Sequence, residues 1–204
     1  MIDEKLTKGD IDKYLSEINE RLSSIGKQGE IVMAGGAVFT AVFNARQSTR
    51  DIDAFFQPSE EMRKIISDMS EEHDLPKNWL NDGVKGFITS KMNKEVYQEF
   101  SNLSVYTVDA EGLLALKLTS ARMESWDMSD SIVLMKHLNI GNVDELYEIV
   151  EKYTHKNQQT PTSFYFTQIA FETYQEQLQN ESERDSKQKQ SQMERFKRQQ
   201  GYER

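Results

Sequence analysis

Ile31-Val32-Met33-Ala34-Gly35-Gly36 and, fourteen residues later, Asp51-Ile52-Asp53 are the two stretches that decide how this 204-residue sequence folds. The short apolar run ended by a glycine pair predicts a buried strand that leads into a tight turn. Small and apolar residues over 37–44 then predict a short helix, and a polar turn over 46–50 follows. The alternation of acidic and apolar residues over 51–56, broken by Pro58, predicts a second strand with one solvated end.

The same two stretches carry the strongest chemical signal in the sequence. Residues i and i+2 of a strand point the same way, so the carboxylates of Asp51 and Asp53 project side by side while Ile52 enters the core. Two such charges repel unless a cation lies between them, and Mg²⁺ prefers carboxylate and phosphate oxygens. Gly35 and Gly36 allow close backbone approach, and the first amides of the following helix are donors for phosphate oxygens. Alone, a glycine pair is commonly a tight turn and Asp-x-Asp a solvated strand end; together they predict a phosphate site with Asp51 and Asp53 as Mg²⁺ ligands.

The rest of the chain is predicted to be mainly helical around this pair of strands. Apolar residues at helical spacing predict helices over 6–25, 59–69, 112–122, 128–138, 143–153 and 163–174, and short alternating runs predict strands over 84–88 and 103–108. The expected fold is α/β (α+β), a small mixed sheet with flanking helices and a C-terminal helical part. The expected division is an N-terminal helix in 1–28, a core in 29–110, a helical part in 111–174, and a Gln-rich tail in 175–204 that is a frayed helix or disordered.

Composition and charge exclude several classes of function. The chain has no cysteine and three scattered histidines, which excludes a disulfide framework, a thiolate nucleophile and a Cys-based zinc site. The sequence has neither an apolar run of membrane-spanning length nor an apolar segment at its start, so a cytoplasmic protein is expected. The net charge is −9, but residues 175–204 carry seven Lys/Arg and six Asp/Glu, which leaves −10 on the first 174 residues. This charge argues against a body that coats duplex nucleic acid without regard to sequence, because that binding depends on neutralising phosphates, and it leaves a local basic groove as an alternative.

The passage from Gly35 to Asp53 resembles the signature of the nucleotidyltransferase fold of the DNA polymerase β superfamily. That resemblance implies that Gly35 and Gly36 hold a nucleoside triphosphate and that Asp51 and Asp53 bind Mg²⁺. Arg46 fits the resembled pattern as a phosphate ligand, although balancing the charge of the two acids is an equal alternative. We expect the site to be metal-dependent and built from oxygen ligands.

The following region resembles a narrower group, the bacterial nucleotidyltransferase-like proteins that include abortive-infection toxins of toxin–antitoxin pairs. The matching residues are Leu113-Leu114-Ala115-Leu116-Lys117-Leu118, then Ala121-Arg122, then Asp127-Met128-Ser129-Asp130-Ser131-Ile132. By this analogy Lys117 contacts the triphosphate and Asp127 is the acid that completes the catalytic set. The alternatives are that Lys117 extends to solvent along its apolar helix, and that Asp127 or Asp130 merely caps the helix that begins there.

One departure from the superfamily pattern keeps the activity open. The superfamily places a third carboxylate on a neighbouring strand, but the predicted strand 103–108 contains no acid, and Asp109 directly after it is better suited to cap the next helix. The leading hypothesis is transfer of a nucleoside monophosphate from a nucleoside triphosphate to an RNA or protein hydroxyl, in a toxin with an antitoxin partner. The alternative is a catalytically inactive member that uses the fold to bind a partner. A structural protein of a phage or mobile element is a third class that the Gln-rich tail permits.

Overall fold

A five-stranded mixed sheet forms the centre of the computed structural model, which describes residues 5–122 and 126–199. The strand order is β5-β4-β2-β7-β6, in which β2 is antiparallel to β4 and parallel to β7. The strands are β2 (Gly29–Ala34), β4 (Ile52–Gln57), β5 (Leu80–Asn81), β6 (Lys94–Glu99) and β7 (Leu103–Val108). The predicted α+β class is confirmed.

The two faces of this sheet differ in character because side chains alternate along each strand. Ile31, Ile52 and Val105 belong to the face that is fully buried, beneath α1 (Lys8–Ser24) and α3 (Ser59–Glu72). Asp53 lies on the opposite face, as does Phe55, two residues further along β4. This second face is only partly covered, so acidic groups on it remain accessible.

Two short strands tie the start of the chain to the polar turn predicted over 46–50. β1 (Leu6–Thr7) pairs antiparallel with β3 (Ser48–Thr49), so the turn contains a strand. Thr7 also caps α1 in a reciprocal arrangement with Asp10, which fixes where that helix begins. The N-terminal segment is thereby held next to α2 (Gly35–Ala41) and the Asp51/Asp53 pair.

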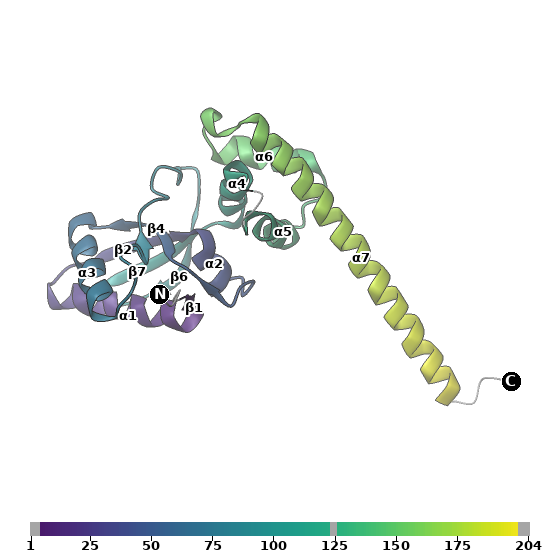
Figure 1. Ribbon diagram of the computed structural model, residues 1–204, viewed down its shortest axis with the longest axis horizontal. Helices are drawn as coiled ribbons and strands as arrows, with labels where there is room; N and C mark the ends of the chain where they lie inside the picture. Colours follow the sequence, from purple (N-terminus) through teal and green to yellow (C-terminus); the bar gives the residue numbers. More distant parts are fainter. Residues whose placement is uncertain (1–4, 123–125, 200–204) are drawn as a thin grey trace.

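The C-terminal half is a group of helices beside the sheet (Figure 1). It comprises α4 (Ala110–Ser120), α5 (Asp127–Leu138), α6 (Val143–Tyr153), the short 3-10 helix η1 (Lys156–Gln158) and α7 (Pro161–Gln199). α4 is buried almost all round, including its one lysine, because α5, α6 and α7 all pack on it. None of the helices within the described ranges combines the length and apolar character that crossing a bilayer requires.

One predicted strand is wrong, and one observed strand has no counterpart among the predictions. Residues 84–88 form local turns closed by bonds such as Ile88 N to Val84 O (3.1 Å), whereas β6 was not predicted. The reason is that β6 is an edge strand with mostly exposed residues, so its sequence lacks the apolar alternation that marks a half-buried strand. The proposed domain boundaries remain a prediction.

The predicted helix over 163–174 is the first part of a much longer one. α7 packs on the other helices through Phe166, Ala170 and Tyr174, and from Leu178 its described side chains are exposed. The tail prediction thus resolves in favour of helix as far as Gln199, while residues 200–204 lie outside the described part. Figure 1 shows this helix running away from the rest of the molecule.

Candidate functional site

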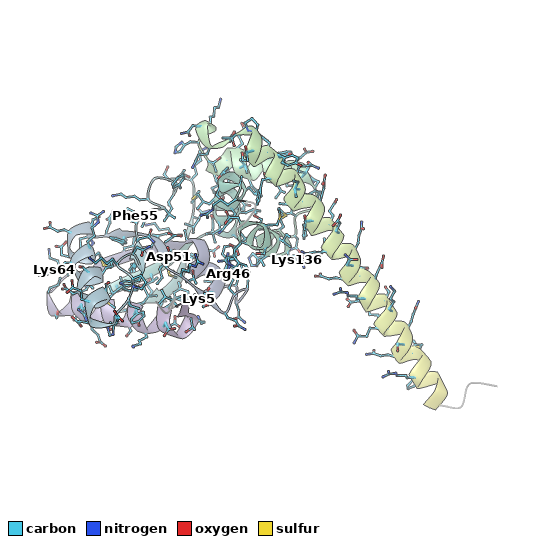
Figure 2. All side chains as sticks on the ribbon, in the orientation of Figure 1. Lys5, Arg46, Asp51, Phe55, Lys64 and Lys136 are labelled. Atoms are coloured by element: carbon cyan, nitrogen blue, oxygen red, sulfur yellow. The ribbon has the colours of Figure 1, made fainter. Side chains whose placement is uncertain are left out.

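A cleft of about 850 Å³ lies between the sheet and the start of the helical half. Its lining includes every residue that the sequence marked for the site: Gly35, Gly36, Arg46, Asp51, Asp53, Lys117 and Asp127. Lys5, which precedes β1, meets Arg46 and Asp51, from the turn before β4, at this cleft; all three are labelled in Figure 2. Lys5 and Asp127, which are 122 positions apart in sequence, therefore line the same cavity.

The glycine pair is required by the close approach of α2 to β4. Gly35 follows Ala34, which pairs with Asp53 across the two strands, and it has a φ of +61°. A Cβ at Gly35 would lie 2.6 Å from Asp53 Oδ2, and a Cβ at Gly36 would lie 2.6 Å from Thr49 Oγ1. A Cβ at either position would force these side chains to shift, because the backbone at the start of α2 lies directly against them, and the positive φ of Gly35 also favours glycine.

Asp51 and Asp53 form an electrostatically strained pair. Burial raises the pKa of Asp51, and the negative charge of Asp53 raises it further, while Arg50 and Arg122 act in the opposite direction. Asn81 Nδ2 donates to Asp51 Oδ2 at 3.4 Å. Asn81 lies on β5, where it is the strand neighbour of Asp53 on β4. Two partly buried carboxylates with oxygen atoms directed into one cleft are a donor set suited to a divalent cation.

The neighbouring strand supplies no third acid, as the sequence indicated. Asp53 on β4 lies beside Ala34 on β2, and Met33 on β2 lies beside Thr107 on β7. One residue further along both strands, the neighbour of Ala34 on β7 is therefore Val108, which is apolar and buried. Asp109 instead accepts a hydrogen bond from Gly112 N at 3.0 Å and caps α4, which confirms the capping interpretation.

Lys117 is buried and meets anions, but in this structure those anions belong to the protein. Its Nζ lies 2.8 Å from Asp127 Oδ1 and 2.8 Å from Asp130 Oδ2, and its side chain is 9% exposed. The ammonium also lies 5.4 Å from the centre of the Phe39 ring. The alternative in which Lys117 extends to solvent is therefore wrong.

Asp127 is the centre of a dense set of donors. Lys117 binds one carboxylate oxygen, whereas Ser120 Oγ and Arg122 Nε, the latter at 2.9 Å, bind the other. Burial by itself raises the pKa of this group, but the hydrogen bonds from Arg122, Lys117 and Ser120 outweigh it and bring the pKa to about 2. Asp127 is thus held ionised by protein cations.

Arg46 does not balance the Asp51/Asp53 pair by direct contact; its bond is to Asp130. Both Nε, at 3.0 Å, and Nη2 donate to the Asp130 carboxylate, which is 2% exposed. The guanidinium lies between two rings, 5.5 Å from the centre of Phe39 and 4.9 Å from that of Trp126. Asp130 therefore links α5 to the turn before β4 through Arg46 and to α4 through Lys117, which is more than the capping role considered from sequence.

Several residues of the cleft were missed from sequence. Lys5 reaches it only because β1 pairs with β3, a contact without local sequence signal. Trp126 was not singled out, although a tryptophan in a polar connection directly before Asp127 is a visible feature. Ser48 and Thr49, which the sequence places in a polar turn, also line the cleft.

A second acidic cluster in the described residues does not offer a comparable site. Glu17, Glu72 and His73 bring ligand atoms within 4.8 Å of one another between α1 and α3. Arg21 donates to Glu17 and Glu72, so these carboxylates already share a cation. We assign this cluster to the packing of the two helices.

Comparison with known proteins gives one family and no individual relative. A family model described as "Nucleotidyltransferase of unknown function (DUF6036)" matches residues 10–179. Neither the curated proteins nor the solved structures gave a match. The matched range includes the glycine pair, both acids before and in β4, Lys117 and Asp127, so the predicted resemblance to nucleotidyltransferases is confirmed. Since the match spans most of the sequence and nearly the whole lining of the cleft, the chain belongs to this family of nucleotidyltransferases.

Proposed function

We propose that the chain is a Mg²⁺-dependent enzyme that transfers a nucleoside monophosphate from a nucleoside triphosphate to a hydroxyl of RNA or protein. The observation that carries the proposal is the convergence of Gly35, Gly36, Asp51, Asp53 and Lys117 on one cleft. A metal-bound triphosphate requires three components: open backbone such as the glycine pair provides, paired carboxylates, and a buried cation.

The residues present fit a Mg²⁺ ion at Asp51 and Asp53. Both offer carboxylate oxygens, and the raised pKa of Asp51 reflects burial and a repulsion that a cation between the two groups would relieve. When bound, Mg²⁺ would offset the charge that builds on the phosphate oxygens during the displacement.

Two cations that are bound to acids of α5 are proposed to hold the phosphates, Lys117 on α4 and Arg46 in the turn before β4. Lys117 and Arg46 are held by Asp127 and Asp130, so their positions are fixed before a ligand enters. The sequence resemblance implies that Asp127 completes the catalytic set, but its contacts with Lys117, Ser120 and Arg122 favour a positioning role instead. Preorganised cations of this kind stabilise charge without reorganising during the reaction.

The reaction is an in-line displacement at the α-phosphorus. The acceptor oxygen forms a bond to that phosphorus, the bond to the bridging oxygen breaks, and pyrophosphate leaves. The proton of the acceptor hydroxyl passes to water at the open cleft, because Val108 occupies the position next to Ala34 where an acid could have taken it.

The sequence resemblance suggests the biological role. We propose a toxin of a toxin–antitoxin pair with an antitoxin as its protein partner. The body carries −10, so a protein hydroxyl or the end of a single RNA strand fits better than a long duplex. α7, exposed beyond Leu178, is the element available for partner contacts.

The test is label transfer from nucleoside triphosphates labelled at the α-phosphate. Incubation with cellular RNA and protein and with Mg²⁺ should label an RNA or protein species. Asp51→Asn and Asp53→Asn should each abolish the label, whereas Asp144→Asn, an exposed acid on α6, should not affect it. Label that persists in both acid variants contradicts the proposal.

A binding module without activity is the second candidate, and two observations favour it. The acid expected beside Asp53 is absent from β7, and both oxygens of Asp127 are taken by protein donors. This candidate predicts Mg²⁺-dependent nucleotide binding without label transfer to any acceptor, including RNA and protein from cells that express the native partner.

A further inference from the structure

An exposed tryptophan at the mouth of the cleft has no role in the chemistry described above. Trp126 immediately precedes α5 and lines the cleft together with Asp51 and Asp53, and it is 64% exposed. The other tryptophan, Trp79, is fully buried, and its Nε1 donates to Ile66 O at 3.1 Å. Trp126 thus presents a large, flat aromatic surface at the cleft and not in the core, and such a surface can pack on another ring.

The position of Trp126 is fixed by its surroundings. Its carbonyl oxygen accepts hydrogen bonds from Asp130 N at 2.8 Å and from Ser129 Oγ at 3.0 Å, which anchors the residue at the start of α5. The Arg46 guanidinium lies over the indole at 4.9 Å and is itself fixed by Asp130. The Arg46 guanidinium covers one side of the indole, and the rest of the indole is open at the cleft. Four more cationic side chains line that cleft: Lys5, Arg50, Lys117 and Arg122.

We propose that Trp126 is the nucleobase-stacking residue of this cleft and that it makes purine nucleoside triphosphates the preferred donors. The inference rests on the proposed function and extends it to the donor. A cleft of about 850 Å³ is large enough for a nucleotide. The triphosphate lies between the glycine pair and Lys117, and the base lies on the indole. Stacking accepts every base, and it favours purines because two fused rings cover more of the indole than one ring does.

The test uses the full chain and compares nucleotides with a ligand that lacks a base. ATP, GTP, CTP, UTP and inorganic tripolyphosphate are titrated with Mg²⁺ and followed by calorimetry and by tryptophan emission. Purine nucleotides should bind more tightly than pyrimidine nucleotides and quench the emission. Trp126→Leu should weaken purine binding about tenfold and abolish the quenching, because the buried Trp79 that remains does not contact the ligand.

Three controls separate stacking from other effects. Trp126→Phe should retain part of the affinity, since a smaller aromatic ring still stacks. Phe164→Leu, a substitution of an exposed aromatic residue on α7, should bind as the wild type does. Tripolyphosphate should bind the wild type and Trp126→Leu equally, because Arg46 keeps its bond to Asp130 in both.

The outcomes distinguish this inference from the function on which it rests. If ATP binds the wild type with Mg²⁺ and Trp126→Leu binds it equally well, the stacking role is overturned and the proposed function remains. If Trp126→Leu weakens the binding of tripolyphosphate as much as it weakens the binding of ATP, the indole acts through Arg46 and the stacking role is again overturned. If no nucleotide binds the wild type, both the proposed function and this inference are overturned.

Discussion

Replacing Asp127 by Asn removes a buried negative charge while keeping the size of the side chain. In the native protein this carboxylate is 1% exposed and is bound by Lys117, Ser120 and Arg122. The pKa of Asp127 is about 2, against an ordinary value of 3.8. A carboxylate with a lowered pKa stabilises the folded state at every pH above its unfolded value, and this stabilisation is lost as the pH falls through the folded value.

The magnitude follows from the two pKa values. Each pKa unit corresponds to about 1.4 kcal/mol, so the charge contributes about 2 kcal/mol to the free energy of unfolding near neutral pH. Linkage predicts that about half of this contribution remains at about pH 3, since the unfolded chain is then mostly protonated at this group while the folded chain is not. Asp127→Asn should therefore be destabilised by about 2 kcal/mol near neutral pH and by about 1 kcal/mol at about pH 3.

Urea unfolding at several pH values, followed by far-UV circular dichroism, measures this difference. Asp82→Asn is the matched control, because Asp82 pairs with Arg63, whose side chain is 59% exposed, and surface pairs contribute less than about 1 kcal/mol. If the difference between wild type and Asp127→Asn is the same at about pH 7 and about pH 3, the charge of Asp127 is not what stabilises the fold, and the reasoning is refuted.

Three further predictions concern the same cleft. Asp51→Asn should raise the thermal midpoint when divalent cations are chelated, because a carboxylate with a raised pKa destabilises the folded protein once the pH rises above that pKa. Mg²⁺ should stabilise the wild type and not the variant, and differential scanning fluorimetry measures both effects. Gly35→Ala should destabilise the fold more than Gly26→Ala in urea and should abolish nucleotide binding; both have positive φ, but only at Gly35 does a Cβ meet another side chain, so equal losses would contradict the steric argument. Asp130→Asn should cost about 3 kcal/mol because two buried cations lose a shared partner, whereas Glu30→Gln, which breaks a more exposed pair, should cost less than about 1 kcal/mol; similar urea midpoints would show that the buried pairs do not stabilise the fold.

The glycine pair and the two acids could be located from sequence because their signal is local. A strand, a turn and a second strand lie within residues 31–56, and strand geometry alone aligns Asp51 with Asp53. The family match confirms the class of protein that this passage indicated. The catalytic and metal-binding roles of these residues remain predictions.

The partners of the cleft cations could not be derived in the same way. Arg46 and Asp130 are 84 residues apart, and nothing in either segment indicates that the turn before β4 packs on α5. From the sequence, Arg46 is expected either to bind phosphate or to balance the charge of Asp51 and Asp53, whereas in the structure it binds the buried carboxylate of Asp130. Long-range pairs of this kind depend on how the helical half docks on the sheet, which periodicity does not determine.

Strand β6 and the length of α7 were missed for reasons of burial. Both are largely exposed, so neither has the apolar pattern from which an element is inferred. β6 is specified by its ladder with β7, and α7 continues a helix that is already packed up to Tyr174.

The central claim is that the Asp51/Asp53 pair binds a nucleoside triphosphate together with Mg²⁺. Isothermal titration of the full chain with each of the four nucleoside triphosphates, with Mg²⁺ and with a chelator, tests it most directly. We expect binding that requires Mg²⁺ and that is lost in Asp53→Ala. Binding of equal strength in the chelator, or in Asp53→Ala, would contradict it, as would the absence of binding to all four nucleotides.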